Sequence, residues 1–269
     1  MIQIGASNSA ALFALLDQQA IELDTITVYG SQSIDVVQRA VAYKPVLLHD
    51  VSNTFWLNYE DPFTDTATVT KARAMLDVAK SPWFSTGIGA SAEPQGHTSP
   101  YWRGADASQL QSRERVIENI TKHGLRLRGW AGVPLLLENY NYHPTNAYEY
   151  VCEPDLFTQL VEAIDCEMLL DLPHARISAY NMHWGDDPRP YLAALPLYKV
   201  REIHFNRPHF DGQQMLDFHQ SIQADDLALL SWVIERCPNL QVITLESEAP
   251  SEKALLEEFR LLRGLLTSG

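Results

Sequence analysis

Short apolar segments alternate with amphipathic segments along the whole chain. The apolar segments are rich in Val, Ile and Leu, which is typical of strands that are buried on both faces of a parallel sheet. The amphipathic segments carry their apolar residues at helical spacing. This pattern predicts eight strands, over residues 2–5, 24–29, 45–49, 83–90, 133–139, 168–171, 200–205 and 241–246.

The alternation of strands with helices predicts a (β/α)8 TIM barrel. We expect one domain over residues 1–269, because barrels of roughly 250 residues form single domains. A doubly wound sheet is the alternative, and it is weakened because no GxGxxG turn follows the first predicted strand. An open polar loop is expected between the sixth strand and a short helix that starts at Pro190.

Five of the predicted strands end in a residue that can bind a metal ion. Active sites of β/α barrels lie at the rim where the carboxyl ends of the strands meet, so these side chains are expected to face one mouth. In strand order they are His49, Glu138, Asp171, His204 and Glu246.

Three further residues extend this set. His174 lies three residues past Asp171, and Asp217 and His219 lie in the loop expected after the seventh strand. Four carboxylates in one dry cleft repel one another unless protons or cations neutralise them. Two or three divalent cations would do so, and mixed imidazole and carboxylate ligands suit Zn, Mn and Fe.

Other polar residues near the expected mouth are weaker candidates. We expect His123, at the end of a predicted helix, to be a surface charge. No residue is identified as a general acid or base. The candidate substrate contacts are His97, Asn139, Asn181 and Arg207.

Composition limits the classes of partner. The net charge of −14 and the absence of a run of Lys or Arg argue against nucleic acid, so a small molecule or a peptide is expected. The three cysteines show no framework spacing and indicate reduced thiols in a cytoplasmic protein. The N-terminal residues do not resemble a signal peptide, and no apolar run approaches the roughly 20 residues that cross a bilayer.

Seven short motifs follow one another in the second half of the chain. They are Leu137-Glu138-Asn139, Leu169-Leu170-Asp171, Ser178-Ala179-Tyr180-Asn181, Tyr191-Leu192 with Leu195-Pro196, Val200-Arg201-Glu202-Ile203-His204, Asp217-Phe218-His219 and Thr244-Leu245-Glu246. In kind and order they resemble the multinuclear non-heme iron-dependent oxidase family, which includes the methanobactin-biosynthesis oxidase. The resemblance covers about residues 40 to 260 and is best over 134 to 246.

The resemblance implies a xylose-isomerase-like barrel with two or three metal ions, iron in the first place and Zn or Mn as alternatives. It implies oxidation by dioxygen of a peptide side chain or a small thiol-containing substrate, and a small partner protein that presents the peptide. The eight residues named above would be the ligands. The chain departs from the family at His174, where Asn is common, at Gly87, where the fourth strand usually ends in His, and at Asn206, where Gly is usual.

Other functions fit part of the pattern. The same ligand order resembles the trinuclear zinc site of endonuclease IV-type phosphodiesterases, although the net charge argues against DNA. A sugar isomerase or epimerase could hold one Mn on Glu138, Asp171, His204 and Glu246, which would leave Asp217 and His219 unused. A non-enzymatic barrel that has lost its metals is the last alternative. It ranks last because it would require all eight ligand types to persist by chance.

Overall fold

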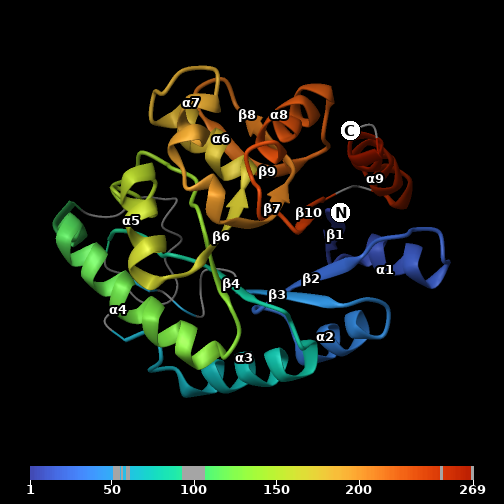
Figure 1. Ribbon diagram of the computed structural model, residues 1–269, viewed down its shortest axis with the longest axis horizontal. Coiled ribbons are helices and arrows are strands. Elements are labelled where there is room, and N and C mark those ends of the chain that lie inside the picture. The colour runs from blue at the N-terminus through green and yellow to red at the C-terminus, as the bar shows by residue number, and fades with distance from the viewer. Residues whose placement is uncertain (51–54, 56, 59–60, 93–106, 249–250, 268–269) are drawn as a thin grey trace.

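The computed structural model describes residues 1–50, 55, 57–58, 61–92, 107–248 and 251–267. Eight parallel strands close into a barrel in the order β1-β10-β7-β6-β5-β4-β3-β2. Helices surround the strands on the outside (Figure 1). The (β/α)8 prediction is therefore confirmed, and the doubly wound sheet is wrong, because such a sheet would remain open at both edges.

The barrel strands lie where the apolar segments predicted them, with ends that differ by a few residues. Their β-branched and leucine side chains are buried, as expected for strands covered on both faces. The strands are β1 (Gln3–Ser7), β2 (Thr25–Tyr29), β3 (Val46–Asp50), β4 (Phe84–Gly87), β5 (Leu135–Glu138), β6 (Glu167–Asp171), β7 (Val200–Phe205) and β10 (Val242–Leu245).

Several helices begin at polar residues that cap them. The side chains of Ser9, Asp65 and Ser112 each accept a hydrogen bond from a backbone amide of the first turn, which satisfies a donor that the helix leaves free. The helices are α1 (Ala10–Asp17), α2 (Ile34–Val41), α3 (Thr66–Ala79), α4 (Arg113–Ala131), α5 (Pro154–Ile164), α6 (Leu172–Asn181), α7 (Arg189–Ala194), α8 (Ala224–Ile234) and α9 (Glu252–Thr267).

An apolar plug fills the lower part of the barrel. It consists of Leu47, Trp83, Leu136, Leu169 and Val242, and all five side chains are buried. Side chains two positions apart in a strand point to the same face, so the next inward residues after three plug leucines belong to the rim. At these positions the sequence places a histidine on β3, a glutamate on β5 and an aspartate on β6.

Helix α6 replaces the open polar loop that was expected after the sixth strand, so that prediction is wrong. The Asp171 carboxylate accepts a hydrogen bond from the His174 amide at 2.6 Å and caps the helix, and Pro173 lies in its first turn. The weak apolar periodicity of this segment hid a helix whose start signal, an Asp with Pro two positions later, is present in the sequence.

A β-hairpin replaces the loop in which Asp217 and His219 were expected. Strands β8 (Arg207–Phe210) and β9 (Met215–Gln220) pair antiparallel, and both residues lie on β9. Gly212, with a φ of 102°, allows the tight turn between the strands. The hairpin is tied to α6 because the Asn181 side chain bonds both the carbonyl and the amide of Met215, each at 3.1 Å.

His123 is buried, with an exposed fraction of 2%, so the expectation of a surface charge is wrong. Helix α4 continues for two turns beyond this residue to Ala131, so His123 lies within the helix, among its buried residues. Its Nδ1 atom lies 2.8 Å from the Leu57 carbonyl oxygen. Burial lowers the pKa of this imidazole, so it stays neutral and packs as part of the core.

Two further expectations concern thiols and membranes. Cys152, Cys166 and Cys237 are free, as predicted, and all three are buried. Within the described ranges, every helix is too short or too polar to span a bilayer.

The base of the hairpin is fixed by one buried carboxylate. Asp226 of α8 forms ion pairs with Arg176 of α6 and with Arg207 at the start of β8, the latter at 2.7 Å. The Asp226 side chain has an exposed fraction of 0%, whereas that of Asp225, which also pairs with Arg207, is 61% exposed.

Replacing Asp226 with Asn should lower the free energy of unfolding by about 3 kcal/mol, because two poorly solvated guanidinium groups lose their shared partner. The matched variant Asp225→Asn should cost less than about 1 kcal/mol, since an exposed pair contributes little. Urea unfolding of the two variants checks this difference. Equal destabilisation by both variants would contradict the role given to Asp226.

Candidate metal centre

The predicted ligands gather at the carboxyl end of the barrel, at the bottom of a cavity of about 1060 Å³. His204 lies beneath the cavity floor and is fully buried. The other predicted ligands line the cavity, and they are His49, Glu138, Asp171, His174, Asp217, His219 and Glu246.

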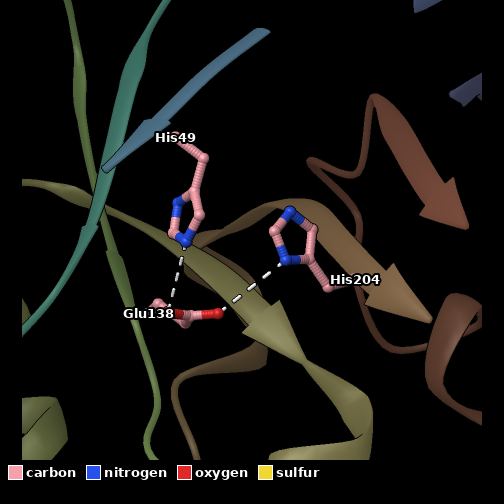
Figure 2. Close-up of side chains that lie close together, drawn as sticks. All are labelled: His49, Glu138 and His204. Carbon is pink, nitrogen blue, oxygen red and sulfur yellow. Dashed lines mark ion pairs between the residues drawn. The ribbon is translucent and has the colours of Figure 1, made fainter. Parts of the chain in front are cut away.

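A deep cluster lies directly on the barrel strands. Glu138 stands between two imidazoles, 3.5 Å from Nε2 of His49 and 3.8 Å from Nδ1 of His204. Figure 2 shows both rings turned toward this carboxylate, one from β3 and the other from β7. Nδ1 of His204 also lies 3.0 Å from Glu246 and 4.0 Å from Asp171. Potential ligand atoms of Asp171, His204 and Glu246 all lie within 4.8 Å of one another, a spacing that one metal ion can bridge.

An outer cluster joins α6 to the hairpin. The Asp217 carboxylate lies 3.2 Å from Nε2 of His174 and 3.3 Å from Nε2 of His219. Nδ1 of His174 lies 3.6 Å from Asp171 and 3.9 Å from Glu138, both of which also face the deep cluster. The two clusters are therefore adjacent, with Glu138 and Asp171 between them.

Neighbouring groups orient two of the imidazoles. Nδ1 of His49 bonds the Ser85 hydroxyl at 2.9 Å, and Nδ1 of His174 bonds the Asn139 carbonyl oxygen at 3.0 Å. In each ring Nε2 is then left to face the carboxylates. A partner on one ring nitrogen that fixes which nitrogen binds the metal is a usual feature of metal sites.

Several buried polar atoms of the centre lack a hydrogen-bond partner among the described residues. They include both ring nitrogens of His204 and Oδ1 of Asp217. The short distance from His204 to Glu246 does not have hydrogen-bond geometry. Leaving such an atom unsatisfied costs about 1–3 kcal/mol, and a bound cation would satisfy it. The chain's imidazole and carboxylate donors therefore fit a metal group of the Zn, Mn or Fe type.

The carboxylates divide into two electrostatic classes. Burial, together with the nearby Glu246 and Glu138 charges, raises the pKa of Asp171 to about 8 against the lowering effect of His174. Burial also acts on Glu246 and Asp217, but the adjacent imidazoles outweigh it and hold the pKa of each below its ordinary value. Asp171 therefore carries a proton at neutral pH while the other two are ionised.

The pKa values of three imidazoles are raised by the carboxylates around them. Burial lowers the pKa of His219, yet the Asp217 carboxylate outweighs it and the pKa rises to about 9. Carboxylates likewise raise the pKa of His174 and His204 well above the ordinary value in spite of burial. Without a metal, these rings carry protons at neutral pH and neutralise the carboxylates around them.

Sequence reasoning missed two groups of the rim. The Tyr29 hydroxyl, at the end of β2, donates to Glu246 at 2.5 Å and lies 2.5 Å from the Ser7 hydroxyl at the end of β1. Both residues line the cavity. Applying the rule of polar residues at strand ends to the first two strands would have identified both.

Tyr140 is a third group that the sequence did not indicate. Its buried hydroxyl lines the cavity and makes no hydrogen bond of good geometry within the described part of the chain. The ring fills the space beside Gly87, where an added Cβ would lie 2.5 Å from Cε1 of Tyr140. Tyr140 therefore occupies the place that a side chain at the end of β4 would take.

The weaker candidates have other partners. The Asn139 side chain forms two hydrogen bonds of 2.9 Å with the backbone of Asp171. The Asn181 side chain bonds the hairpin, and Arg207 forms ion pairs with two aspartates of α8. None of these three lines the described part of the cavity wall. His97 lies outside the described residues.

Sequence comparison matches the chain to a family model and to relatives. A family model described as "RiPP precursor modification enzyme MbnB/TglH/ChrH" matches residues 19–267. A UPF0276 protein of Anaeromyxobacter sp. (strain Fw109-5) is 25% identical over 235 residues, which cover 86% of this chain and 78% of the relative.

Two solved structures share the fold. Endonuclease IV from Thermus thermophilus has a TM-score of 0.64 at 17% identity, and the match covers 99% of this chain and 100% of that enzyme. A xylose isomerase-like TIM barrel protein from Mycobacterium smegmatis has a TM-score of 0.58 at 14% identity, and the match covers 100% of this chain and 97% of that protein. At these identities the likeness shows the fold alone, and the xylose-isomerase-like barrel is confirmed.

Metal binding should release protons, because the imidazoles and Asp171 must lose theirs before they coordinate. The apparent metal affinity should rise with pH, by about tenfold per pH unit for each proton displaced, up to the His219 pKa of about 9. Calorimetric titration with Zn²⁺ in buffers of different ionisation heat measures this release. An affinity that stays constant as pH rises to that value would contradict the charge state given to the centre.

Proposed function

The chain belongs to the MbnB/TglH/ChrH family of RiPP precursor modification enzymes, and on this premise we propose that it is an iron-dependent oxidase of peptide side chains. RiPPs are ribosomally synthesised and post-translationally modified peptides. The observation that carries the proposal is the meeting of four imidazoles and four carboxylates in two adjacent clusters under one cavity.

The two clusters support a centre of two or three metal ions. One divalent cation would leave half of the negative charge of four ionised carboxylates in place, whereas two would balance it. Iron is proposed from the motif resemblance, because the donor atoms by themselves also suit Zn and Mn. When bound, iron would supply activation of dioxygen and a binding position for a substrate thiolate.

The chain's own residues hold and orient this group. The barrel strands supply the deep ligands, and α6 and the hairpin supply the outer ones. Ser85 and Asn139 fix the rings of His49 and His174, so that their Nε2 atoms face the carboxylates. The apolar plug closes the barrel below, which keeps water away from the centre on that side.

The shape and charge of the cavity favour a peptide. Its volume of about 1060 Å³ exceeds that of most small-molecule sites. One wall consists of the small side chains Ala10, Ala11 and Ala14 of α1, and the lining also includes Glu248 and Glu252, which would repel a phosphate backbone. A small partner protein that presents the peptide, and a cytoplasmic location, remain predictions.

The deciding experiment is elemental analysis of protein purified without chelator, together with its visible spectrum in air. Two or more irons per chain with a visible ferric band would support the oxidase. Zinc at a similar ratio with no colour would overturn it and favour the hydrolysis of phosphodiesters, which zinc-bound hydroxide can attack.

Replacing His204 with Ala should lower metal content by at least one ion per chain and reduce oxygen consumption with a cysteine-containing peptide at least about 100-fold. The reason is that its Nδ1 faces Glu138, Asp171 and Glu246 together. The matched variant His183→Ala changes a residue outside the cavity wall, and it should keep the metal content and the oxygen consumption of the wild type. Full metal content in His204→Ala would refute the ligand assignment.

A further inference from the structure

A fully buried carboxylate lies under the metal centre, inside the barrel. Glu202 precedes His204 by two positions on β7, so both side chains point inward. Its neighbours on the adjacent strands are Leu169 of β6 and Val242 of β10, both members of the apolar plug. A carboxylate in such surroundings is costly unless both oxygens find donors, so its presence needs a physical reason.

Two neutral donors clamp the Glu202 carboxylate. The Trp83 indole Nε1–H donates to Oε2 at 2.8 Å, and the Thr244 hydroxyl donates to Oε1 at 2.8 Å. The Thr244 hydroxyl of β10 lies 3.2 Å from the Thr27 hydroxyl of β2, and β1 runs between these two strands. These contacts come from β10 and β2 and from the residue that precedes β4, so barrel closure itself fixes the position of the carboxylate.

The His204 ring lies between Glu202 and the metal-facing carboxylates. Its Nε2 is 3.5 Å from Oε1 of Glu202. Its Nδ1 faces Glu246, Glu138 and Asp171, at 3.0, 3.8 and 4.0 Å. The two nitrogens of one ring therefore have distinct surroundings, with a single clamped carboxylate on one side and the candidate ligands on the other.

We propose that Glu202 is a positioning residue whose carboxylate, 3.5 Å from Nε2 of His204 and outside hydrogen-bond geometry, holds a proton on that nitrogen by its charge and so leaves Nδ1 as the metal-binding atom. A carboxylate on the second ring nitrogen fixes the tautomer and makes the ligating nitrogen more basic. At His49 and His174 the corresponding partners are a hydroxyl and a carbonyl. This inference rests on the proposed metal centre, but it depends neither on iron nor on the peptide substrate.

The test measures Zn²⁺ affinity by competition with a chromophoric chelator. Glu202→Gln should weaken binding about 10–100-fold, the usual loss when a partner of this kind is removed. The matched variant Glu167→Gln should bind as the wild type does. Glu167 pairs with Arg201 at 2.7 Å at the amino end of β6, away from the rim.

A second variant separates positioning from folding. In Glu202→Gln the new amide group can meet the Trp83 N–H, so two donors face each other and the fold itself could suffer. Adding Trp83→Phe removes that conflict. The double variant should fold, as judged by urea unfolding, and should show the same loss of Zn²⁺ affinity.

A spectroscopic readout tests the geometry directly. In the zinc-loaded wild type, ¹⁵N–¹H spectra of the imidazoles should show His204 bound through Nδ1 with a proton on Nε2. Binding through Nε2, or unchanged affinity in Glu202→Gln and in the double variant, would overturn the inference alone. A wild type that binds no zinc would overturn the metal centre as well.

Discussion

The structure depends on one electrostatic constraint, the neutralisation of four carboxylates that converge at the mouth of the barrel. Glu138 and Asp171 lie between two clusters of imidazoles, and burial removes the water that would otherwise screen them. In the absence of metal, protons on His174, His204, His219 and Asp171 balance this charge. Metal ions can replace those protons on the same side chains.

Strand alternation lets the barrel carry both a core and a charged site. On β3, β5 and β6 an inward leucine of the plug is followed two residues later by an inward ligand. The plug supplies the packing that holds the ligands in place. On β7 the corresponding lower position is Glu202, and the barrel accommodates it by turning Trp83 and Thr244 toward it.

The two halves of the centre differ in how they are held. The deep ligands project from strands that are fixed on both sides by the parallel sheet. Asp217 and His219 project from a two-stranded hairpin whose support comes from Asn181 and from the pairing of Arg207 with Asp226. Asn181 and Arg207, which sequence reasoning offered as substrate contacts, thus support the strand that carries the outer ligands.

The sequence by itself determined the barrel, the carboxyl-end rim and the eight candidate ligands, because burial on both faces and polar strand ends are local patterns. It also carried the start signal of α6, which its weak periodicity obscured. Tertiary structure alone decided which ring nitrogen faces which carboxylate, and it placed Tyr140 in the space beside Gly87. The contact of Tyr29 with Glu246 joins residues 217 positions apart. Such contacts arise from closure and register of the barrel, which set distances that no local pattern contains.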